Sequence, residues 1–167
     1  MRLAINLTRS TVARFLVIGL LAQGGCARFP KSSGTPSPPD ISTVSVDSAK
    51  GWQQTHLEAH RGEQVEMWAE GTWCPGGSTN WCRSAEGVDI LGYKYSPLFL
   101  VFYSPDPMPL EPINKLIGKI GEGPPFAVGE HCIVTAQADG ELELRPNDWY
   151  LDNNNGRLLV RVRIGGK

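Results

Sequence analysis

The stretch "GRLLVRVRI", Gly156 to Ile164, alternates between two faces, with Leu159 as the one apolar residue on the arginine side. Its other aliphatic residues fall on one side: Leu158, Val160, Val162 and Ile164. Its arginines fall on the other side: Arg157, Arg161 and Arg163. A period of two with one charged face is typical of a strand in an antiparallel sheet with water on one side. We therefore predict a half-buried β-strand here.

Two earlier segments show the same alternation. In "EQVEMWAEG", residues 63–71, Val65, Met67 and Ala69 share one face, and in "GELELRP", residues 140–146, Leu142 and Leu144 do. Clusters of Gly, Pro, Asn and Asp separate six further strand candidates. These are "STVSV" (42–46), "QTHLEAH" (54–60), "LFLVFYS" (98–104), "KLIGKI" (115–120), "FAVG" (126–129) and "CIVTAQA" (132–138). The pattern predicts an all-β chain: a single antiparallel, jelly-roll-like β-sandwich of about eight or nine strands in residues 42–167.

The first 25 residues have the features of a secretory signal peptide. Arginines at 2, 9 and 14 precede an apolar core, Phe15 to Ala22, that is too short to span a bilayer. The small residues that end at Cys26 resemble a bacterial lipoprotein box, which predicts acylation of Cys26. Ordinary cleavage after Ala27, which would release a soluble protein, is the alternative.

Residues 26–41 are rich in Pro and Ser and have too little apolar surface to pack, so we expect a tether. This arrangement predicts an exported protein of the bacterial cell envelope that meets the membrane only through its lipid. The anchor would place it at the outer membrane or cell surface, and without the anchor it would be periplasmic or secreted.

Charge argues against a nucleic-acid partner. The chain has 16 basic and 17 acidic residues, and the leader holds three of the basic residues and none of the acidic ones. The mature chain is therefore at about −4, from 13 minus 17. A general nucleic-acid binder needs a basic face, so we predict none of that activity.

The cysteines suit an oxidising compartment. Cys74 and Cys82 bracket the Gly-rich "PGGSTNW", and a disulfide between them would close that loop. A pair of buried thiols is the alternative. If Cys26 carries lipid, Cys132 is expected to be an unpaired core thiol. The C-x7-C spacing does not fit a zinc site.

Enzyme signatures are missing from the sequence. In "HLEAH", His56 and His60 are four apart, but Glu58 does not follow the first histidine as the zincin pattern H-E-x-x-H requires. No G-x-S-x-G elbow, P-loop or G-x-G-x-x-G occurs. We therefore expect a binding protein, not an enzyme.

The loop "PNDWYLDNNNG", Pro146 to Gly156, is the most polar part of the domain. Asn and Asp suit turns, and "NNG" alone would make a hairpin corner. A connection of ten residues is long for a hairpin, however, and its two clusters of oxygen-bearing side chains would suit a hard cation. Both interpretations stay open. Trp149 and Tyr150, in the middle of the loop, could stack on a sugar ring or plug the end of the sandwich.

Four segments together resemble a known family: "LIGKIG", "FAVG", "TAQADGELEL" and "ND…DNNNG". They resemble the PA-IL-type lectins, calcium-dependent galactose-binding bacterial proteins with a jelly-roll sandwich. The resemblance covers most of residues 42–164 and is clearest from 113 to 162. It implies a galactose-binding-like domain in which an aspartate, two consecutive asparagines and two backbone carbonyls hold Ca²⁺, and two sugar hydroxyls complete the shell. The matching side chains are Asp148, Asn153 and Asn154.

The resemblance makes Asp148, Trp149, Tyr150 and Asn153 the candidate sugar-binding residues. The loop is about two residues shorter than in the lectins, and their sugar-contacting histidine and glutamine have no counterpart here. The sequence thus predicts a carbohydrate- or glycoconjugate-binding, lectin-like domain with Ca²⁺ as cofactor. The alternative is a cell-envelope structural or protein-interaction lipoprotein that keeps the sandwich without a working sugar site.

Overall fold

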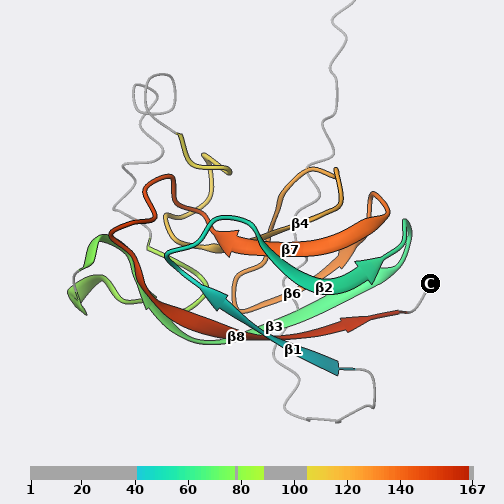
Figure 1. The fold of residues 1–167 in the computed structure, drawn as a ribbon, viewed down its shortest axis with the longest axis horizontal. Helices are drawn as coiled ribbons and strands as arrows, with labels where there is room; N and C mark the ends of the chain where they lie inside the picture. Colours follow the sequence, from blue (N-terminus) through green and yellow to red (C-terminus); the bar gives the residue numbers. More distant parts are fainter. Residues whose placement is uncertain (1–40, 78, 89–104, 166–167) are drawn as a thin grey trace, which may run out of the picture.

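Two four-stranded antiparallel sheets face each other in the computed structural model, which describes residues 41–77, 79–88 and 105–165 (Figure 1). The predicted β-sandwich is therefore confirmed. The strands are β1 (Ile41–Asp47), β2 (Gln53–Ala59), β3 (Gln64–Cys74), β4 (Leu116–Ile120), β5 (Phe126–Ala127), β6 (His131–Thr135), β7 (Gly140–Pro146) and β8 (Asn155–Ile164). Two short 3-10 turns follow β3, η1 (Pro75–Gly77) and η2 (Thr79–Trp81). The ninth candidate, residues 98–104, lies outside the described residues.

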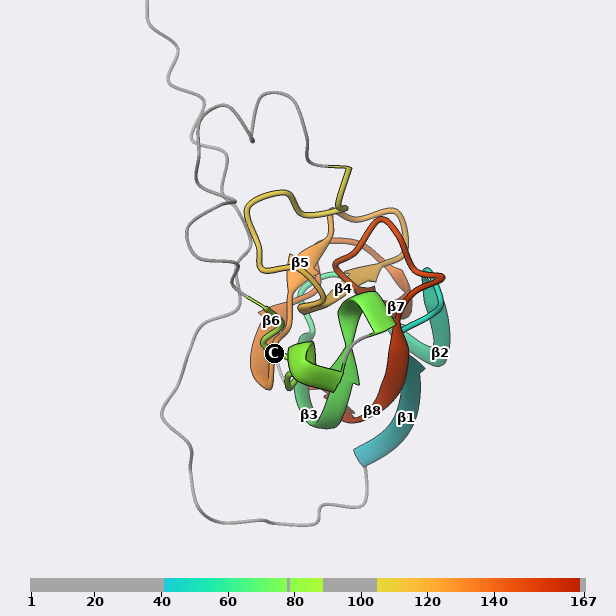
Figure 2. The same ribbon diagram turned by 90° about the vertical axis from the view of Figure 1, so that its left-hand side faces the viewer.

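Consecutive strands mostly belong to opposite sheets. One sheet has the order β1-β8-β3-β6 and the other has the order β2-β7-β4-β5. The chain passes from one sheet to the other after β1, β2, β3, β5, β6 and β7, and only β4 and β5 are neighbours in both sequence and sheet. Figure 2, turned so that one end of the sandwich faces the viewer, shows several of these connections together. Among the described strands, the connections are therefore mostly crossing loops, and β4–β5 is a hairpin.

The alternation seen in the sequence is the division between core and surface. Leu158, Val160 and Val162 of β8 are at most 1% exposed, and they lie against the equally buried Val65 and Met67 of β3 within one core cluster. Burying a side chain of this size stabilises the fold by about 1.5–3 kcal/mol. The two longest strands, β3 and β8, pair in register over ten residues and form the centre of their sheet.

The polar face of β3 and β8 carries ion pairs. Glu66 bonds both His131 and Arg163, and Arg161 bonds Glu70 at 2.7 Å. Trp68 lies among these groups, stacked on the His131 ring at a centroid distance of 5.5 Å. The polar and aromatic side chains of this face thus contact one another.

The disulfide between Cys74 and Cys82 is confirmed. The expectation that Cys132 is an unpaired thiol is wrong, because Cys132 is fully buried and disulfide-bonded. The signal peptide, the tether and Cys26 lie outside the described residues. Within the described ranges, no helix has the length and apolarity to cross a membrane.

The segment "QTHLEAH" is a strand, as its alternation predicts, and not a metalloprotease helix. His56 and His60 are both exposed. His56 has φ 61° at an irregularity in the pairing of β2 with β7 between Gln54 and Glu58. His60 comes one residue after β2 ends.

Candidate functional site

The polar loop crosses one end of the sandwich. Residues 147–154 connect β7, which lies in one sheet, to β8, which lies in the other. The argument from hairpin length is therefore wrong, because these strands do not pair and belong to facing sheets. Asn155 and Gly156 are not a corner either. They belong to β8, opposite Cys74 and Trp73 of β3.

Asn147, which the sequence did not single out, holds this end of the molecule together. Its side chain is fully buried and makes four hydrogen bonds to the backbone of residues 108–112. Its Nδ2 donates to the carbonyls of Met108 (2.9 Å), Pro112 (3.1 Å) and Glu111 (3.2 Å), and its Oδ1 accepts from the Met108 amide (2.9 Å). The loop is thereby fastened to the segment before β4. In the sequence, Asn147 is indistinguishable from an ordinary turn asparagine.

Asp148 and Asn154 lie side by side beneath the loop. Asn154 Nδ2 donates to Asp148 Oδ2 at 3.0 Å and to the Ser48 carbonyl at 3.2 Å. The amide of Tyr150 donates to Asp148 Oδ1 at 2.9 Å. Among the described residues nothing donates to Asn154 Oδ1, although this oxygen is buried. Burying an acceptor without a hydrogen-bond partner destabilises the fold by about 1–3 kcal/mol. A donor or a cation that contacted this oxygen would remove that cost.

A second buried carboxylate lies close to Asp148. Asp106 accepts the Trp149 amide at 3.1 Å, and the Arg145 guanidinium donates to the Asp148 carbonyl at 2.6 Å. Burial raises the pKa of Asp148 above its usual value, and the charge of Asp106 raises it further. The Tyr150 amide, the Asn154 amide and Arg145 oppose that shift in pKa. Two acids in one partly buried place favour a positive partner.

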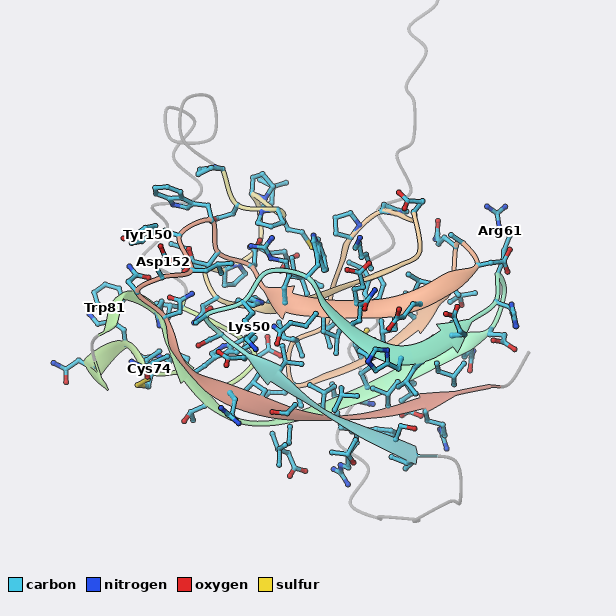
Figure 3. All side chains as sticks on the ribbon, viewed as in Figure 1. Lys50, Arg61, Cys74, Trp81, Tyr150 and Asp152 are labelled. Atoms are coloured by element: carbon cyan, nitrogen blue, oxygen red, sulfur yellow. A yellow bond between two sulfur atoms is a disulfide. The ribbon has the colours of Figure 1, made fainter. Side chains whose placement is uncertain are left out.

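The aromatic pair is exposed. Trp149 is 64% exposed and Tyr150 is 47% exposed, so neither plugs the sandwich. Their ring centroids are 5.6 Å apart with a tilt of 42°. Trp73 of β3 is the buried tryptophan of this end instead. Figure 3 shows Tyr150 and Asp152 at the edge of the molecule, at the end opposite to Arg61.

The structure brings together two of the three predicted metal ligands. Asp148 and Asn154 are in contact, whereas Asn153 is exposed. In the described part of the chain, no three His, Cys, Asp or Glu side chains gather as a metal cluster. A cation here would therefore depend on amide and backbone oxygens besides Asp148, a donor set that suits calcium.

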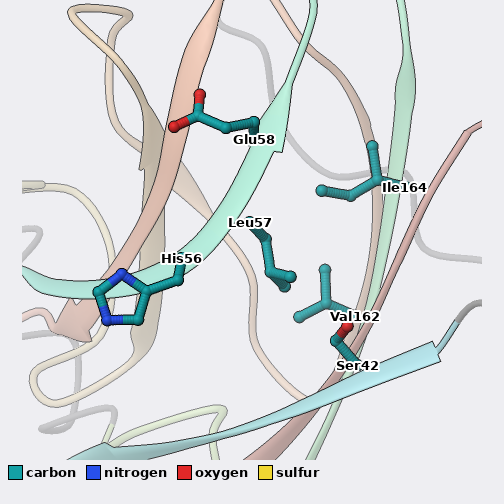
Figure 4. A pocket seen from close by; sticks show the side chains of 6 residues that line it. All are labelled: Ser42, His56, Leu57, Glu58, Val162 and Ile164. Carbon is teal, nitrogen blue, oxygen red and sulfur yellow. The ribbon is translucent and has the colours of Figure 1, made fainter.

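A separate hollow opens on the flank between β1 and β2. It has a volume of about 360 Å³ and is lined by Ser42, His56, Leu57, Glu58, Val162 and Ile164. In Figure 4 the three aliphatic side chains point toward one another, whereas the His56 ring and the Glu58 carboxylate point away from them. Ligand sites usually have polar groups that converge on the ligand. The loop end of the sandwich is therefore the better candidate.

A solved structure with a similar fold is the EclA N-terminal domain, described as a PllA-like lectin. The TM-score is 0.53 with 22% sequence identity, over 73% of this chain and 94% of that domain. The chain has a lectin-like fold. At this identity the similarity shows the fold alone, and it does not show membership of the PA-IL-type lectins. The sequence matches no protein-family model and no curated protein.

The raised pKa of Asp148 predicts how the free energy of unfolding changes with pH. Below pH 3.8, its ordinary pKa, the carboxyl is neutral in the folded and unfolded states alike. As the pH rises from there through the folded pKa, the unfolded chain loses this proton first, so the free energy of unfolding falls. Asp148→Asn should remove that fall, because asparagine keeps an oxygen for the Tyr150 amide and carries no charge. Urea unfolding in EDTA across this pH range measures the difference between the two proteins. A difference that stays constant with pH would contradict the shift in pKa.

Proposed function

We propose that this domain binds carbohydrate at the loop end of the sandwich, with Ca²⁺ bridging protein and sugar. The observation that carries the proposal is the buried, unpartnered Oδ1 of Asn154 beside the Asp148 carboxylate, in a loop that also carries two exposed aromatic rings. The similarity of the fold to a PllA-like lectin domain supports the same function. Because the similar solved structure is described as a lectin, we propose a binding role and no catalysis.

Calcium fits the chemistry of the buried pair. Ca²⁺ takes six to eight oxygen ligands in flexible geometry. Asp148 supplies a carboxylate, and Asn154 supplies an amide oxygen that has no other partner among the described residues. Asn153, exposed on the same loop, is the third proposed ligand. A divalent charge would also offset the repulsion between Asp148 and Asp106.

The aromatic pair suits a sugar. One face of a hexose carries mostly C–H groups, which pack on the face of an aromatic ring. Trp149 and Tyr150, which directly follow Asp148 in the chain, offer such exposed faces. Vicinal hydroxyls of a neutral sugar can replace calcium's waters. We propose Asp148, Trp149, Tyr150 and Asn153 as the sugar-binding residues.

Calcium binding should raise the melting temperature of the wild type, because a ligand that binds only the folded state stabilises it. At a calcium concentration of about 100 Kd the gain is about 2.7 kcal/mol, or several degrees for a domain of this size. Asp148→Ala should abolish the shift. Glu122→Ala is the matched control, since Glu122 is an exposed acid two residues after β4 that takes no part in the loop.

A printed glycan array with and without EDTA then tests sugar binding itself. Calcium-dependent signals that disappear in Asp148→Ala would support the proposal. An unchanged melting temperature in millimolar calcium, together with a blank array, would overturn it.

One observation favours a second candidate, a cell-envelope interaction or structural module. Asn147 and Asn154 use their amide nitrogens to fasten the loop to residues 48 and 108–112, which is a structural role. Calcium stabilisation with no glycan signal would favour this candidate, in which the ion and the asparagines only hold the end of the sandwich.

We also propose that the protein is exported and anchored through acylated Cys26. Acylation uses the Cys26 sulfur as a thioether, and the chain has only three other cysteines, Cys74, Cys82 and Cys132. Cys74 and Cys82 bond each other, and Cys132 is also disulfide-bonded, so a lipid label has to be traced to Cys26 itself.

Metabolic labelling with a fatty-acid probe should therefore mark the wild type and not Cys26→Ser. Label that survives in Cys26→Ser would refute acylation at this residue.

A further inference from the structure

Another exposed tryptophan lies at the end of the sandwich that carries the proposed sugar site. Trp81, the last residue of η2, is 45% exposed. It belongs to the segment that the Cys74–Cys82 disulfide closes. We propose that this segment carries a second aromatic subsite, so that the domain binds a chain of two or more sugars and not a single ring. The inference rests on the proposed function and specifies its ligand.

The base of the disulfide-closed segment is fixed beside the polar loop. Cys74, the last residue of β3, pairs with Asn155, the first residue of β8. One residue earlier, Trp73 exchanges two backbone hydrogen bonds with Arg83, both 3.0 Å long. The bridge and the disulfide together hold both ends of the segment against the strand that begins at the polar loop.

These links bound the distance from Trp81 to the start of β8, where the polar loop ends. Paired strand residues have Cα atoms up to about 5.5 Å apart, and the Cα atoms of Cys74 and Cys82 are 4.0 Å apart. The Trp81 Cα therefore lies no more than about 13 Å from the Asn155 Cα. In Figure 3 Asp152 lies between Trp81 and Tyr150 along the same edge of the molecule.

This arrangement sets aromatic faces on either side of a polar position. Trp149 and Tyr150 come from one loop and Trp81 comes from another, and the exposed Asp152 lies between the labelled Tyr150 and Trp81 in Figure 3. A sugar chain offers the same alternation, with hydroxyls for the polar position and C–H faces for the rings on both sides. A chain of two or more sugars could meet both aromatic groups at once.

Neither packing nor flexibility explains an exposed tryptophan here. The core position at this end belongs to Trp73, which is fully buried. The disulfide and the Trp73–Arg83 bridge restrict the segment before any ligand arrives, and a restricted segment loses less conformational entropy on binding. The segment that carries Trp81 is thus restricted before a ligand binds.

The experiment uses an array that prints each terminal hexose both alone and at the end of a tri- or tetrasaccharide. For the terminal sugar that binds, the wild type should bind the oligosaccharide about tenfold more tightly than the monosaccharide, which corresponds to about 1.4 kcal/mol. Trp81→Ala should bring that ratio close to one and leave the monosaccharide signal unchanged. Trp149→Ala should weaken both signals.

Two further variants serve as a control and as a test of the disulfide. Leu159→Ala removes another exposed apolar side chain, from the outer face of β8, and should change neither signal. The double variant Cys74→Ser/Cys82→Ser should lose the oligosaccharide gain as Trp81→Ala does, with folding checked by thermal melting.

Three results would overturn the inference while the proposed function stands. They are an unchanged ratio in Trp81→Ala, an equal loss of both signals, or a change in self-association by light scattering without a change in glycan binding. A wild type that binds no glycan at all would instead refute the proposed function.

Discussion

Between β7 and β8 the chain crosses from one sheet of the sandwich to the other, and this crossing determines how the polar groups at that end find hydrogen-bond partners. A crossing loop cannot use the ladder hydrogen bonds of a sheet, so its buried polar groups need other partners. Asn147 supplies partners for the backbone of residues 108–112, and Asp148 receives the Tyr150 amide and the Asn154 side chain. The same contacts leave one acceptor, Asn154 Oδ1, without a partner in the described part of the chain.

The proposed calcium site depends on that oxygen, Asn154 Oδ1. Satisfying the loop with its own groups buries two carboxylates near each other and raises the pKa of Asp148, which weakens the fold at neutral pH. Calcium would relieve both costs at once. Trp149 and Tyr150, both exposed, belong to the same loop as Asp148 and Asn154.

The sequence predicted the parts of the fold that depend on local patterns. The alternation of "GRLLVRVRI" assigned the buried and exposed faces of β8 correctly, and the spacing of Cys74 and Cys82 predicted their disulfide. Pairing between distant strands carries no local signal. The assumption that β7 and β8 form a hairpin was therefore wrong, and the argument from loop length failed with it.

The site was predictable only in part for the same reason. Asp148 and Asn154 could be named because they stand in one polar run, whereas Asp106 reaches them from more than forty residues away. Asn147 stands in the same run, but its structural role depends on contacts with residues 108–112. The disulfide state of Cys132 likewise depends on tertiary structure, and the expected free thiol was wrong.

The most direct test of the proposed site is to follow the side-chain amide of Asn154 by NMR while calcium and then a binding glycan are added. Coordination through Oδ1 should shift the Asn154 Nδ2 resonances, because Nδ2 now donates to Asp148 and the Ser48 carbonyl. The Asn147 amide, which holds the neighbouring segment, should keep its position. A glycan that binds while the Asn154 signals stay unchanged would place the site elsewhere and contradict the account.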